Sequence, residues 1–573
     1  MTIMPSRTGE GRPLSESAAH PISDRVYVGL LAALWLSSLL LVGQLGEVPA
    51  NDSWAYVRAT QSFVETGQIV RVPWTYAPVI TNVLLGAAFA KIFGFSVAVL
   101  KMSSFFMGGL GMLALYGLAR MLGGPRPLSA LVAATFGFGV MHLGLSYTFM
   151  TDVPYTALAI ASLVAFTWGL QKKSLLAHGV GLLLTVAATL SRQTGVVIAA
   201  GLLVTLALMR IRTRRDLWLA AAAFVGLFAL AFVVERALMG WSNFGVFRAL
   251  TSAFVGKAPV YSLTAHSVAS QLCFGLAALP LLVPLVLSPA TVDRKKLFVG
   301  AGLGVFAMVF LLAKFPHMPF WTNLLDRGGL GPVAVHCATV RPMLPGAAWW
   351  TLVTVSAMAG GLSLALIGFW VWETAWPERS VHPEKLFLFV STALYLTPVL
   401  LRNPYFNRYL VPVTPAWLVM LAAATGQPKL SRRSVRWGVA GVLALALFST
   451  ATTTDYLAHL GLRHALVTPL LERKVNAGQI EGGMEFDGHY RYQRPGVVNF
   501  PTTRHDNNWL NERGQELLRS GPTWPHPETY LVSYCENVPG FRSVDSVTRQ
   551  RFLPPTKERL HLLERTPAVP SLP

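Results

Sequence analysis

Charged side chains are scarce in this sequence. Only 13% of its 573 residues are Asp, Glu, Lys or Arg, whereas 53% are hydrophobic, a balance far outside the range of soluble proteins. The 3 cysteines are too few for a disulfide framework and lack the spacing of metal ligands, so we expect them to be incidental. The composition therefore predicts an α-helical polytopic membrane protein.

Acidic residues are fewer than basic ones, 27 against 47, and the position of the excess matters more than its size. After residue 455 the two signs nearly balance, so the excess lies in the apolar part of the chain. There it concentrates in short loops, namely "RIRTRRD" (210–216), "DRKK" (293–296) and "KLSRRSVR" (429–436). Such loops are typical of the cytoplasmic side of a bacterial inner-membrane protein and argue against a nucleic-acid partner.

Apolar runs of roughly the length of a membrane span recur up to about residue 454. They cover residues 27–46, 79–93, 99–121, 127–146, 153–170, 175–190, 193–209, 217–238, 270–288, 297–314, 347–371, 385–401, 409–425 and 437–454. All basic loops fall on the cytoplasmic side only if one run does not span. The weakest is 79–93, which has only about 15 residues and contains Thr81 and Asn82, so we predict an interfacial helix in the first outer loop. About thirteen transmembrane helices remain.

The sequence thus divides into three predicted parts. Residues 1–26 form a cytoplasmic segment, and residues 27–455 form the transmembrane domain, whose first helix we expect to stay uncleaved. Residues 456–573 form a periplasmic domain. In this last part strand-like runs alternate with Gly, Pro and Asn, which predicts a small α/β domain that could recognise an acceptor or only cover the active cavity.

Two carboxylates stand at the outer ends of predicted helices. Asp52 follows the first helix in "EVPANDSWAYVR", and Asp152 precedes Pro154 at the start of another helix. At one membrane depth, these side chains could bind a divalent cation or serve as a general base. The alternative is that Asp52 is an ordinary solvated loop residue and Asp152 a helix N-cap.

Arginines accompany these carboxylates on the outer side, where basic residues are usually sparse. An arginine at a helix boundary is costly without an anionic partner, and its guanidinium matches phosphate oxygens well. Taken together they favour an anionic ligand, although each alone could be a headgroup anchor or a structural ion pair. The outer arginines are Arg58, Arg192, Arg327, Arg402 and Arg408.

The outer loop "KFPHMPFWTNLLDRGGLGP" (314–332) adds His317 and Asn323 to the candidate residues. Its glycines match neither a phosphate-loop nor a dinucleotide pattern, so no nucleotide cofactor is expected. The chain also contains no HExxH motif and no Ser-His-Asp order. The simpler interpretation of the loop is an amphipathic interfacial segment with an aromatic belt residue.

The order of these motifs resembles the GT-C superfamily of integral membrane glycosyltransferases, and most closely its protein-mannosyltransferase-like and aminoarabinose-transferase-like branch. The resemblance rests on Asp52 after the first helix, the following interfacial helix, "TDVP", "RQTG", "NLLDRGGLGP" and "YFNRYLVPVTP". Two positions depart from the family pattern. Asn407 stands where Asp is usual, and "TYAPVI" (75–80) replaces a Glu-Lys-Pro-Pro type stretch.

The resemblance implies a polyprenyl-phosphate sugar donor and a glycan, lipid or protein acceptor at the periplasmic face of the inner membrane. It implies that Asp52 is the catalytic base and that Asp152 takes part in catalysis, in acceptor binding or in holding a divalent metal. Contacts with the donor phosphate are expected from Arg58, Arg192, Gln193, Arg327 and Arg408. Contacts with substrate are expected from Trp54, Tyr56, Tyr76, His317, Asn323, Asn407 and Tyr409.

Two other functions remain open. A lipid or solute transporter would place ionisable residues at mid-membrane and show paired, interrupted helices, whereas here nearly all charges lie at helix ends and no internal repeat is visible. A non-catalytic scaffold would use the last domain as its binding module.

Overall fold

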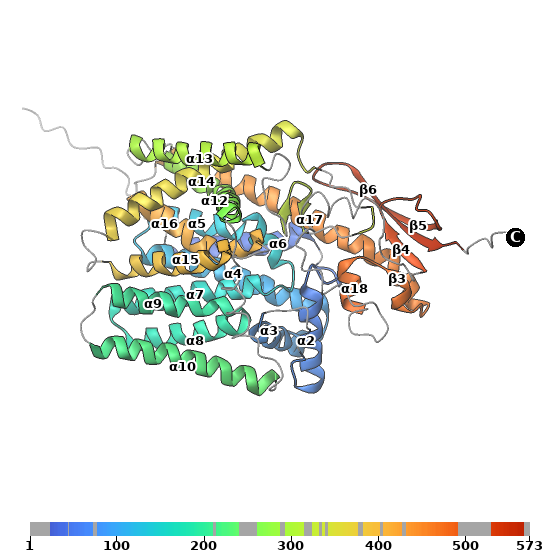
Figure 1. Ribbon diagram of the computed structural model, residues 1–573, viewed down its shortest axis with the longest axis horizontal. Helices are drawn as coiled ribbons and strands as arrows, with labels where there is room; N and C mark the ends of the chain where they lie inside the picture. Colours follow the sequence, from blue (N-terminus) through green and yellow to red (C-terminus); the bar gives the residue numbers. More distant parts are fainter. Residues whose placement is uncertain are drawn as a thin grey trace, which may run out of the picture.

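The computed structural model describes residues 23–43, 45–70, 72, 77–209, 214–239, 260–286, 293–314, 324–331, 335–337, 342–375, 382–401, 405–426, 431–490 and 529–566. In these ranges the chain forms a bundle of roughly parallel and antiparallel helices with a small sheet beyond one end (Figure 1). The predicted class, a helical membrane protein with a small C-terminal α/β part, is confirmed.

Apolar runs account for most helices of the bundle. By length and composition, eight helices in the described ranges could cross a membrane, or up to nine if the bent pair α5 and α6 is one span. The predicted thirteen spans also need shorter apolar helices, so the exact number stays a prediction. The bundle helices are α1 (Asp24–Val42), α4 (Val97–Met121), α5 (Arg126–Gly137), α6 (Val140–Ser146), α7 (Asp152–Lys172), α8 (Leu175–Ser191), α9 (Val196–Leu208), α10 (Arg214–Met239), α12 (Val260–Val286), α13 (Arg294–Lys314), α14 (Gly346–Ala375), α15 (Pro383–Leu401), α16 (Thr414–Ala424) and α17 (Arg432–Glu472).

The segment between α1 and α4, which the sequence predicts to be the first outer loop, contains two helices. Helix α2 (Ser53–Thr66) runs across the end of the bundle, at a large angle to α8 and α10 (Figure 1). Helix α3 (Ile80–Phe93) has 14 residues, which at about 1.5 Å per residue is too short to cross a hydrocarbon core of about 30 Å. Helix α16, which lies in a predicted span, is shorter still with 11 residues, so the non-spanning role of 79–93 stays a prediction.

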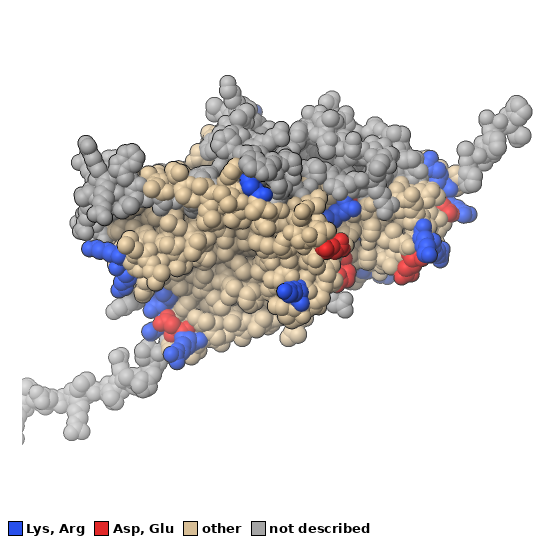
Figure 2. Space-filling model, turned by 90° about the horizontal axis from the view of Figure 1, so that it is seen from below, with Lys and Arg blue, Asp and Glu red and all other residues tan. Residues whose placement is uncertain are grey.

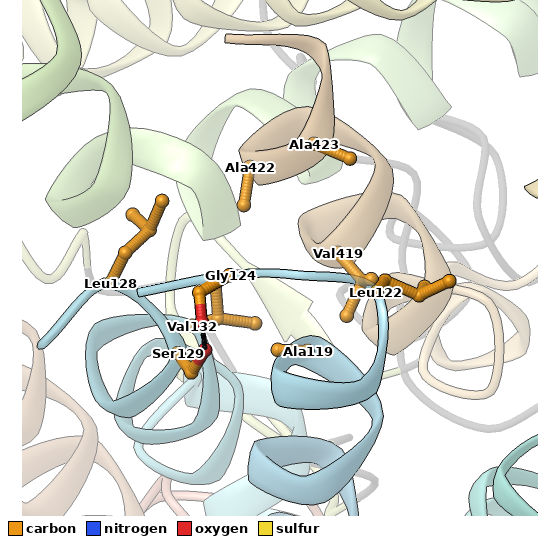
Figure 3. A pocket seen from close by; sticks show the side chains of 9 residues that line it. All are labelled: Ala119, Leu122, Gly124, Leu128, Ser129, Val132, Val419, Ala422 and Ala423. Atoms are coloured by element: carbon orange, nitrogen blue, oxygen red, sulfur yellow. Dashed lines mark hydrogen bonds between the residues drawn. The ribbon is translucent and has the colours of Figure 1, made fainter. Parts of the chain in front are cut away.

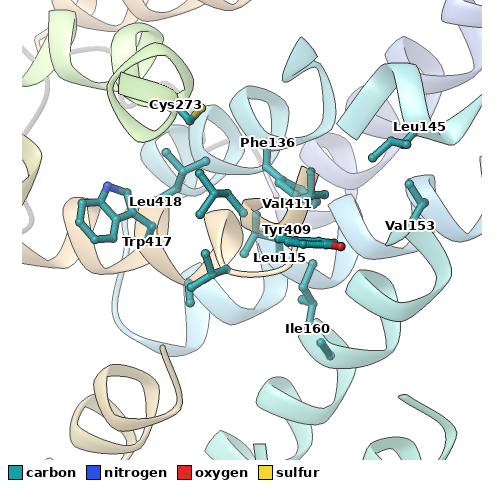
Figure 4. Packing of buried hydrophobic residues seen from close by; sticks show 14 of the residues in the cluster. Leu115, Phe136, Leu145, Val153, Ile160, Cys273, Tyr409, Val411, Trp417 and Leu418 are labelled. Atoms are coloured by element: carbon teal, nitrogen blue, oxygen red, sulfur yellow. The ribbon is translucent and has the colours of Figure 1, made fainter. Parts of the chain in front are cut away.

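Glycines bring three of the helices close together. A Cβ atom on Gly275 of α12 would lie 1.8 Å from the carbonyl oxygen of Ser356 in α14, and one on Gly304 of α13 would lie 2.5 Å from the sulfur of Met358. Only a residue without a side chain permits such an approach. Beside this contact, Phe274 stacks on Trp417 at 4.3 Å, within the apolar core that Figure 4 shows.

The C-terminal part contains a four-stranded sheet with the order β3-β4-β6-β5. Its strands are β3 (Ile480–Glu481), β4 (Tyr530–Ser533), β5 (Phe541–Gln550) and β6 (Lys557–Arg565), and only the β3–β4 pair is parallel. The remaining elements are helix α18 (Met484–Tyr490), the hairpin β1 (Leu325–Asp326) and β2 (Gly329–Leu330), and the 3-10 helices η1 (Gln193–Gly195), η2 (Asn407–Leu410) and η3 (Ala477–Gln479).

Helix α17 joins the sheet to the bundle. It continues without a break through the predicted domain boundary at residue 455, and Figure 1 shows it leaving the bundle to lie against the sheet. Asp455 on this helix pairs with Arg549 of β5 at 3.1 Å, and Arg549 pairs in turn with Glu558 of β6 at 2.5 Å. Because these groups are almost fully buried, the sheet docks on α17 through an internal ion network.

Cys337 and Cys535 form a disulfide. The sequence-based expectation that all cysteines are incidental is therefore wrong for these two, because 198 residues of sequence separate positions that the fold brings together. The bond ties the segment after the β1–β2 hairpin to the C-terminal sheet. Cys273 is free and buried in α12.

The surface also separates charge from apolar area. Figure 2 shows Lys, Arg, Asp and Glu mostly toward the two ends of one face, with largely uncharged surface between them. Large exposed apolar side chains such as Leu40, Phe298 and Leu447 lie on bundle helices, as a lipid-facing surface requires.

Candidate active site

Four segments that are far apart in sequence meet at the end of the bundle nearest the sheet. They are the turn before α2, the start of α7, the turn between α8 and η1, and η2. Each segment supplies one buried or nearly buried charged side chain, namely Asp52, Asp152, Arg192 and Arg408. The sequence predicted all four, and the fold brings them together as two ion pairs.

The first pair joins Asp52 to Arg408. An Nη atom of Arg408 donates to a carboxylate oxygen of Asp52 at 2.8 Å, and the two side chains are 9% (Arg408) and 14% (Asp52) exposed. Burial acts to lower the pKa of Arg408, but the charges of Asp52 and Asp152 outweigh burial and raise it above its ordinary value. Arg408 therefore stays protonated, and both carboxylates act on it.

The second pair joins Asp152 to Arg192. Arg192 donates to one carboxylate oxygen of Asp152, the first residue of α7. The Asp152 side chain is 1% exposed, and its second carboxylate oxygen has no hydrogen-bond partner among the described residues. Burial acts to lower the pKa of Arg192, but Asp152 together with Tyr395 and Tyr409 outweighs burial and raises the pKa above its ordinary value, so this guanidinium is also held in its charged form.

Tyr409 connects the Asp52–Arg408 pair to the Asp152–Arg192 pair. The Tyr409 ring lies 5.4 Å from the guanidinium carbon of Arg192 and 5.8 Å from that of Arg408, so one ring contacts both cations. Figure 4 shows its hydroxyl directed toward α7. Nearby, burial and then the Asp52 charge raise the pKa of Tyr56 well above its ordinary value, so that phenol keeps its proton.

Several polar atoms of this cluster have unused hydrogen-bonding capacity. The Nε and one Nη atom of Arg408 have no hydrogen-bond partner among the described residues. The side-chain oxygen of Gln193 also has no hydrogen-bond partner there. Buried polar groups in native proteins are almost always paired, so such atoms call for a ligand or water. The cluster offers cationic N–H donors for an anion and carboxylate oxygens for a proton, which are the groups that acid–base and phosphate chemistry need.

Three other residues that the sequence predicted for the site lie outside the cluster of the two ion pairs. The buried Trp54 ring packs on Gly488 of α18, where an added Cβ would lie 2.3 Å from it. Arg58, also on α2, lies close enough to His489 for its charge to help burial lower the His489 pKa to about 4. Arg327 sits in the turn of the β1–β2 hairpin, half-buried.

Asn407 uses its whole side-chain amide inside the protein. Its oxygen accepts from the Leu324 N–H at 3.2 Å, and its nitrogen donates to the Leu325 carbonyl at 2.8 Å. It thereby fastens the β1 strand to η2, next to Arg408. Four other candidates, Tyr76, His317, Asn323 and Arg402, lie outside the described residues.

Two further charged residues next to this cluster were not predicted from the sequence. Arg463 of α17 and Glu485 of α18 form an ion pair that is almost completely buried, and Glu485 also contacts the backbone beside Asp52. In the sequence, Arg463 is one of the nearly balanced charges after residue 455. Nothing in the local sequence indicates burial, because it results from docking α18 against α2.

The surroundings of Asp152 do not fit a resident divalent metal. In the described part of the chain no three His, Cys, Asp or Glu side chains gather at one point. Asp152 and Asp52 each have an arginine against the carboxylate, and a cation there would face two positive charges.

Pockets in the described ranges differ in chemistry. One small pocket lies among α4, α5 and α16, at the opposite end of the bundle from Asp52. Its lining is apolar apart from Ser129, as Figure 3 shows, so it offers no catalytic groups. A second pocket lies between the segment after α1, α17 and α18, and its lining includes Glu47, Arg463, Glu485 and His489. This second pocket contains the Arg463–Glu485 pair, and Glu485 in turn accepts the backbone N–H of the residue before Asp52.

No family model matches the chain, and no curated protein matches it in sequence. Solved structures do match. For ArnT from Cupriavidus metallidurans bound to undecaprenyl phosphate, the match covers 96% of this chain and 100% of that chain at 11% identity, with a TM-score of 0.47. For the archaeal oligosaccharyltransferase AglB from Archaeoglobus fulgidus the shares are 77% and 57% at 15% identity, with a TM-score of 0.42.

A chain of the S. cerevisiae protein O-mannosyltransferase Pmt1-Pmt2 complex bound to the sugar donor also matches, over 38% of this chain at 15% identity, with a TM-score of 0.32. These enzymes belong to the GT-C superfamily. The chain spans only 33% of the mannosyltransferase chain, and likeness at these scores assigns no activity, substrate or residue role.

Proposed function

We propose that this protein is a membrane glycosyltransferase that moves a sugar from a polyprenyl-phosphate donor to an acceptor hydroxyl. The observation that carries the proposal is the cluster of two buried carboxylate–arginine pairs that share the Tyr409 ring. Four segments converge to build it at one end of an apolar bundle. A structural ion pair needs neither the second pair nor the uncommitted donors of Arg408.

In the proposed reaction the two arginines bind the donor phosphate. The phosphate competes with Asp52 for the guanidinium of Arg408, so donor binding frees the Asp52 carboxylate. The acceptor oxygen then attacks the anomeric carbon and its proton passes to Asp52. The bond from that carbon to the phosphate oxygen breaks, and its electron pair leaves with the polyprenyl phosphate. The arginines stabilise the charge that develops on the leaving group.

Asp152 has a different proposed role. Its free carboxylate oxygen is buried and already balanced by Arg192, so it is suited to accept a hydrogen bond from a substrate hydroxyl. Tyr409 keeps both guanidinium groups in place between the two carboxylates. In this proposal Trp54 packs α2 against α18, and the polar groups rather than Trp54 bind the sugar.

Orientation in the membrane is part of the proposal. Basic residues such as Lys172, Arg214 and Arg432 lie at helix ends on the side opposite the cluster, as the positive-inside rule requires for the cytoplasm. The Cys337–Cys535 disulfide lies on the cluster's side, and such bonds persist in oxidising compartments. Both features support a periplasmic active site in a bacterial inner membrane, with the C-terminal sheet outside.

The test is transfer by purified protein. A panel of polyprenyl-phosphate pentoses, hexoses and aminopentoses is incubated with the parent protein, and release of polyprenyl phosphate is followed with and without a cell-envelope extract as acceptor. Arg408→Gln should lose release, whereas Arg542→Gln, which removes an exposed arginine of the sheet, is the matched control and should keep it. Movement of the intact lipid across a vesicle membrane without release would instead identify a transporter.

A further inference from the structure

Helix α18 of the C-terminal part reaches the loop that carries Asp52. The helix lies beside α2 in Figure 1, and its Gly488 touches the buried Trp54 ring. A Cβ at position 488 would lie 2.3 Å from that ring, so α18 packs as closely on α2 as a helix can. The contact brings Glu485, one turn earlier on α18, to the start of α2.

Glu485 is 1% exposed and uses both of its carboxylate oxygens. One accepts the backbone N–H of Asn51 at 3.3 Å, and the other accepts from the guanidinium of Arg463. Arg463 comes from α17, so a single carboxylate joins the first outer loop, the last helix of the bundle and the C-terminal part. No other described side chain accepts a hydrogen bond from the Asn51 N–H.

Asn51 occupies an unusual backbone conformation. Its φ of 53° lies in the left-handed region, which side chains other than Asn, Asp and Gly rarely adopt. The residue is 2% exposed, so water does not replace a missing acceptor for its N–H. The next residue is Asp52, and the direction of its carboxylate depends on the turn at Asn51. A hydrogen bond that fixes this turn therefore also fixes Asp52.

We propose that Glu485 is a positioning residue for Asp52. It acts through the Asn51 N–H and holds the Asp52 carboxylate in the direction needed to reach both Arg408 and the acceptor. The inference rests on the proposed role of Asp52 and adds a role for the C-terminal part, which completes the active site from outside the bundle. Proton transfer depends steeply on placement, and a shift of about 1 Å can lower turnover by about 10²-fold.

Removing Glu485 alone would leave Arg463 buried without a partner and could unfold the protein. The experiment therefore compares two double variants that both lack the ion pair, Arg463→Gln with Glu485→Gln and Arg463→Gln with Glu485→Met. They differ in the acceptor at position 485, because glutamine keeps an oxygen for the Asn51 N–H and methionine does not. Release of polyprenyl phosphate gives kcat and the donor KM, and thermal unfolding is measured for each variant.

We expect the glutamine variant to keep kcat within about threefold of the parent and the methionine variant to lose about 10²-fold, with the donor KM unchanged in both. Equal kcat values, or a change in KM alone, would overturn the inference. Gly488→Ala, which forces α18 away from Trp54, should lower kcat in the same way. Glu564→Gln, in a surface ion pair of the sheet, is the control and should leave kcat unchanged.

The outcomes separate this inference from the proposed function. If Asp52→Asn turns over like the parent, the general-base role of Asp52 fails and the inference falls with it. If Asp52→Asn is inactive and the two double variants are equal, only the role of Glu485 fails. A methionine variant that loses turnover but unfolds at the same temperature as the glutamine variant supports positioning and excludes a loss of fold.

Discussion

Replacing Asp52 with asparagine should change both stability and turnover. At 2.8 Å, and with an effective dielectric constant of about 20, the charges of Asp52 and Arg408 attract by about 6 kcal/mol before desolvation is subtracted. Desolvation of two buried ions cancels much of this. Asparagine keeps an oxygen that can accept from Arg408, so Asp52→Asn should cost about 1–3 kcal/mol in the free energy of unfolding. The loss of the base should lower kcat by about 10²- to 10⁴-fold.

A double-mutant cycle separates the pair from its parts. Asp52→Asn, Arg408→Gln and the double variant are unfolded by denaturing detergent in mixed micelles, and the same proteins are assayed for release of polyprenyl phosphate. If the two side chains are paired, the double variant should be about 2–4 kcal/mol more stable than the sum of the single losses predicts.

Catalysis should combine differently. Either single change removes a group that the proposed reaction needs, so the two losses of kcat should not multiply. The kcat of the double variant should lie within about tenfold of the kcat of the slower single variant. Strictly additive stability losses would show that the side chains do not interact in the folded protein and would refute the geometry. A stable Asp52→Asn protein with parental kcat would refute the role of Asp52 and leave Asp152 as the next carboxylate to test.

Three further predictions concern the rest of the site and the C-terminal part. Tyr409→Leu should raise the donor KM by about tenfold with a smaller effect on kcat, because the ring orients two phosphate-binding arginines, and a normal KM would contradict that role. Cys337→Ser or Cys535→Ser should lower the free energy of unfolding by about 2–4 kcal/mol, and peptide mapping without reductant should recover the bridge from the parent alone. Burial acts to raise the pKa of Glu558, but hydrogen bonds from His459 and Tyr534 and the charge of Arg549 hold this pKa far below the ordinary value of 4.5. The ionised Glu558 carboxylate therefore stabilises the fold above about pH 4.5, and this stabilisation is lost as the pH falls below that value. Glu558→Gln should therefore lose less thermal stability than the parent when the pH falls from about 6 to about 3.5, and equal losses would show that another group is responsible.

Local sequence patterns predicted the elements of the fold well, because lipid imposes a simple rule on them. Each run of about 20 apolar residues must become a helix, so composition specifies a helical bundle, and the position of the basic loops predicts which side faces the cytoplasm. The same rule located Asp52, Asp152, Arg192 and Arg408, since charged residues at helix ends on the sparsely basic side stand out. For these four residues, position along the chain was enough to predict that they share one end of the bundle.

Pairing could not be predicted in this way. The sequence left open whether each outer arginine binds phosphate or forms an ion pair, and it did not indicate which aspartate each would meet. The fold places Arg192 against Asp152 and Arg408 against Asp52. It likewise gave no reason to join Cys337 to Cys535 or to bury Trp54 under Gly488. These contacts depend on how distant segments approach, and no local pattern records that approach.

Hydrophobic patterning by itself determined the class of the protein, the rough number of helices and the end of the bundle where charge gathers, since those properties follow from transfer of each segment between water and lipid. Only the tertiary structure decided which charge meets which, that α17 carries the sheet without a break, and that Glu485 of α18 contacts the backbone before Asp52. The physical reason is one of range. Hydrophobic transfer acts on each segment separately, whereas hydrogen bonds and ion pairs between segments require their atoms to come within about 3 Å, which only the packing of all the helices together can arrange.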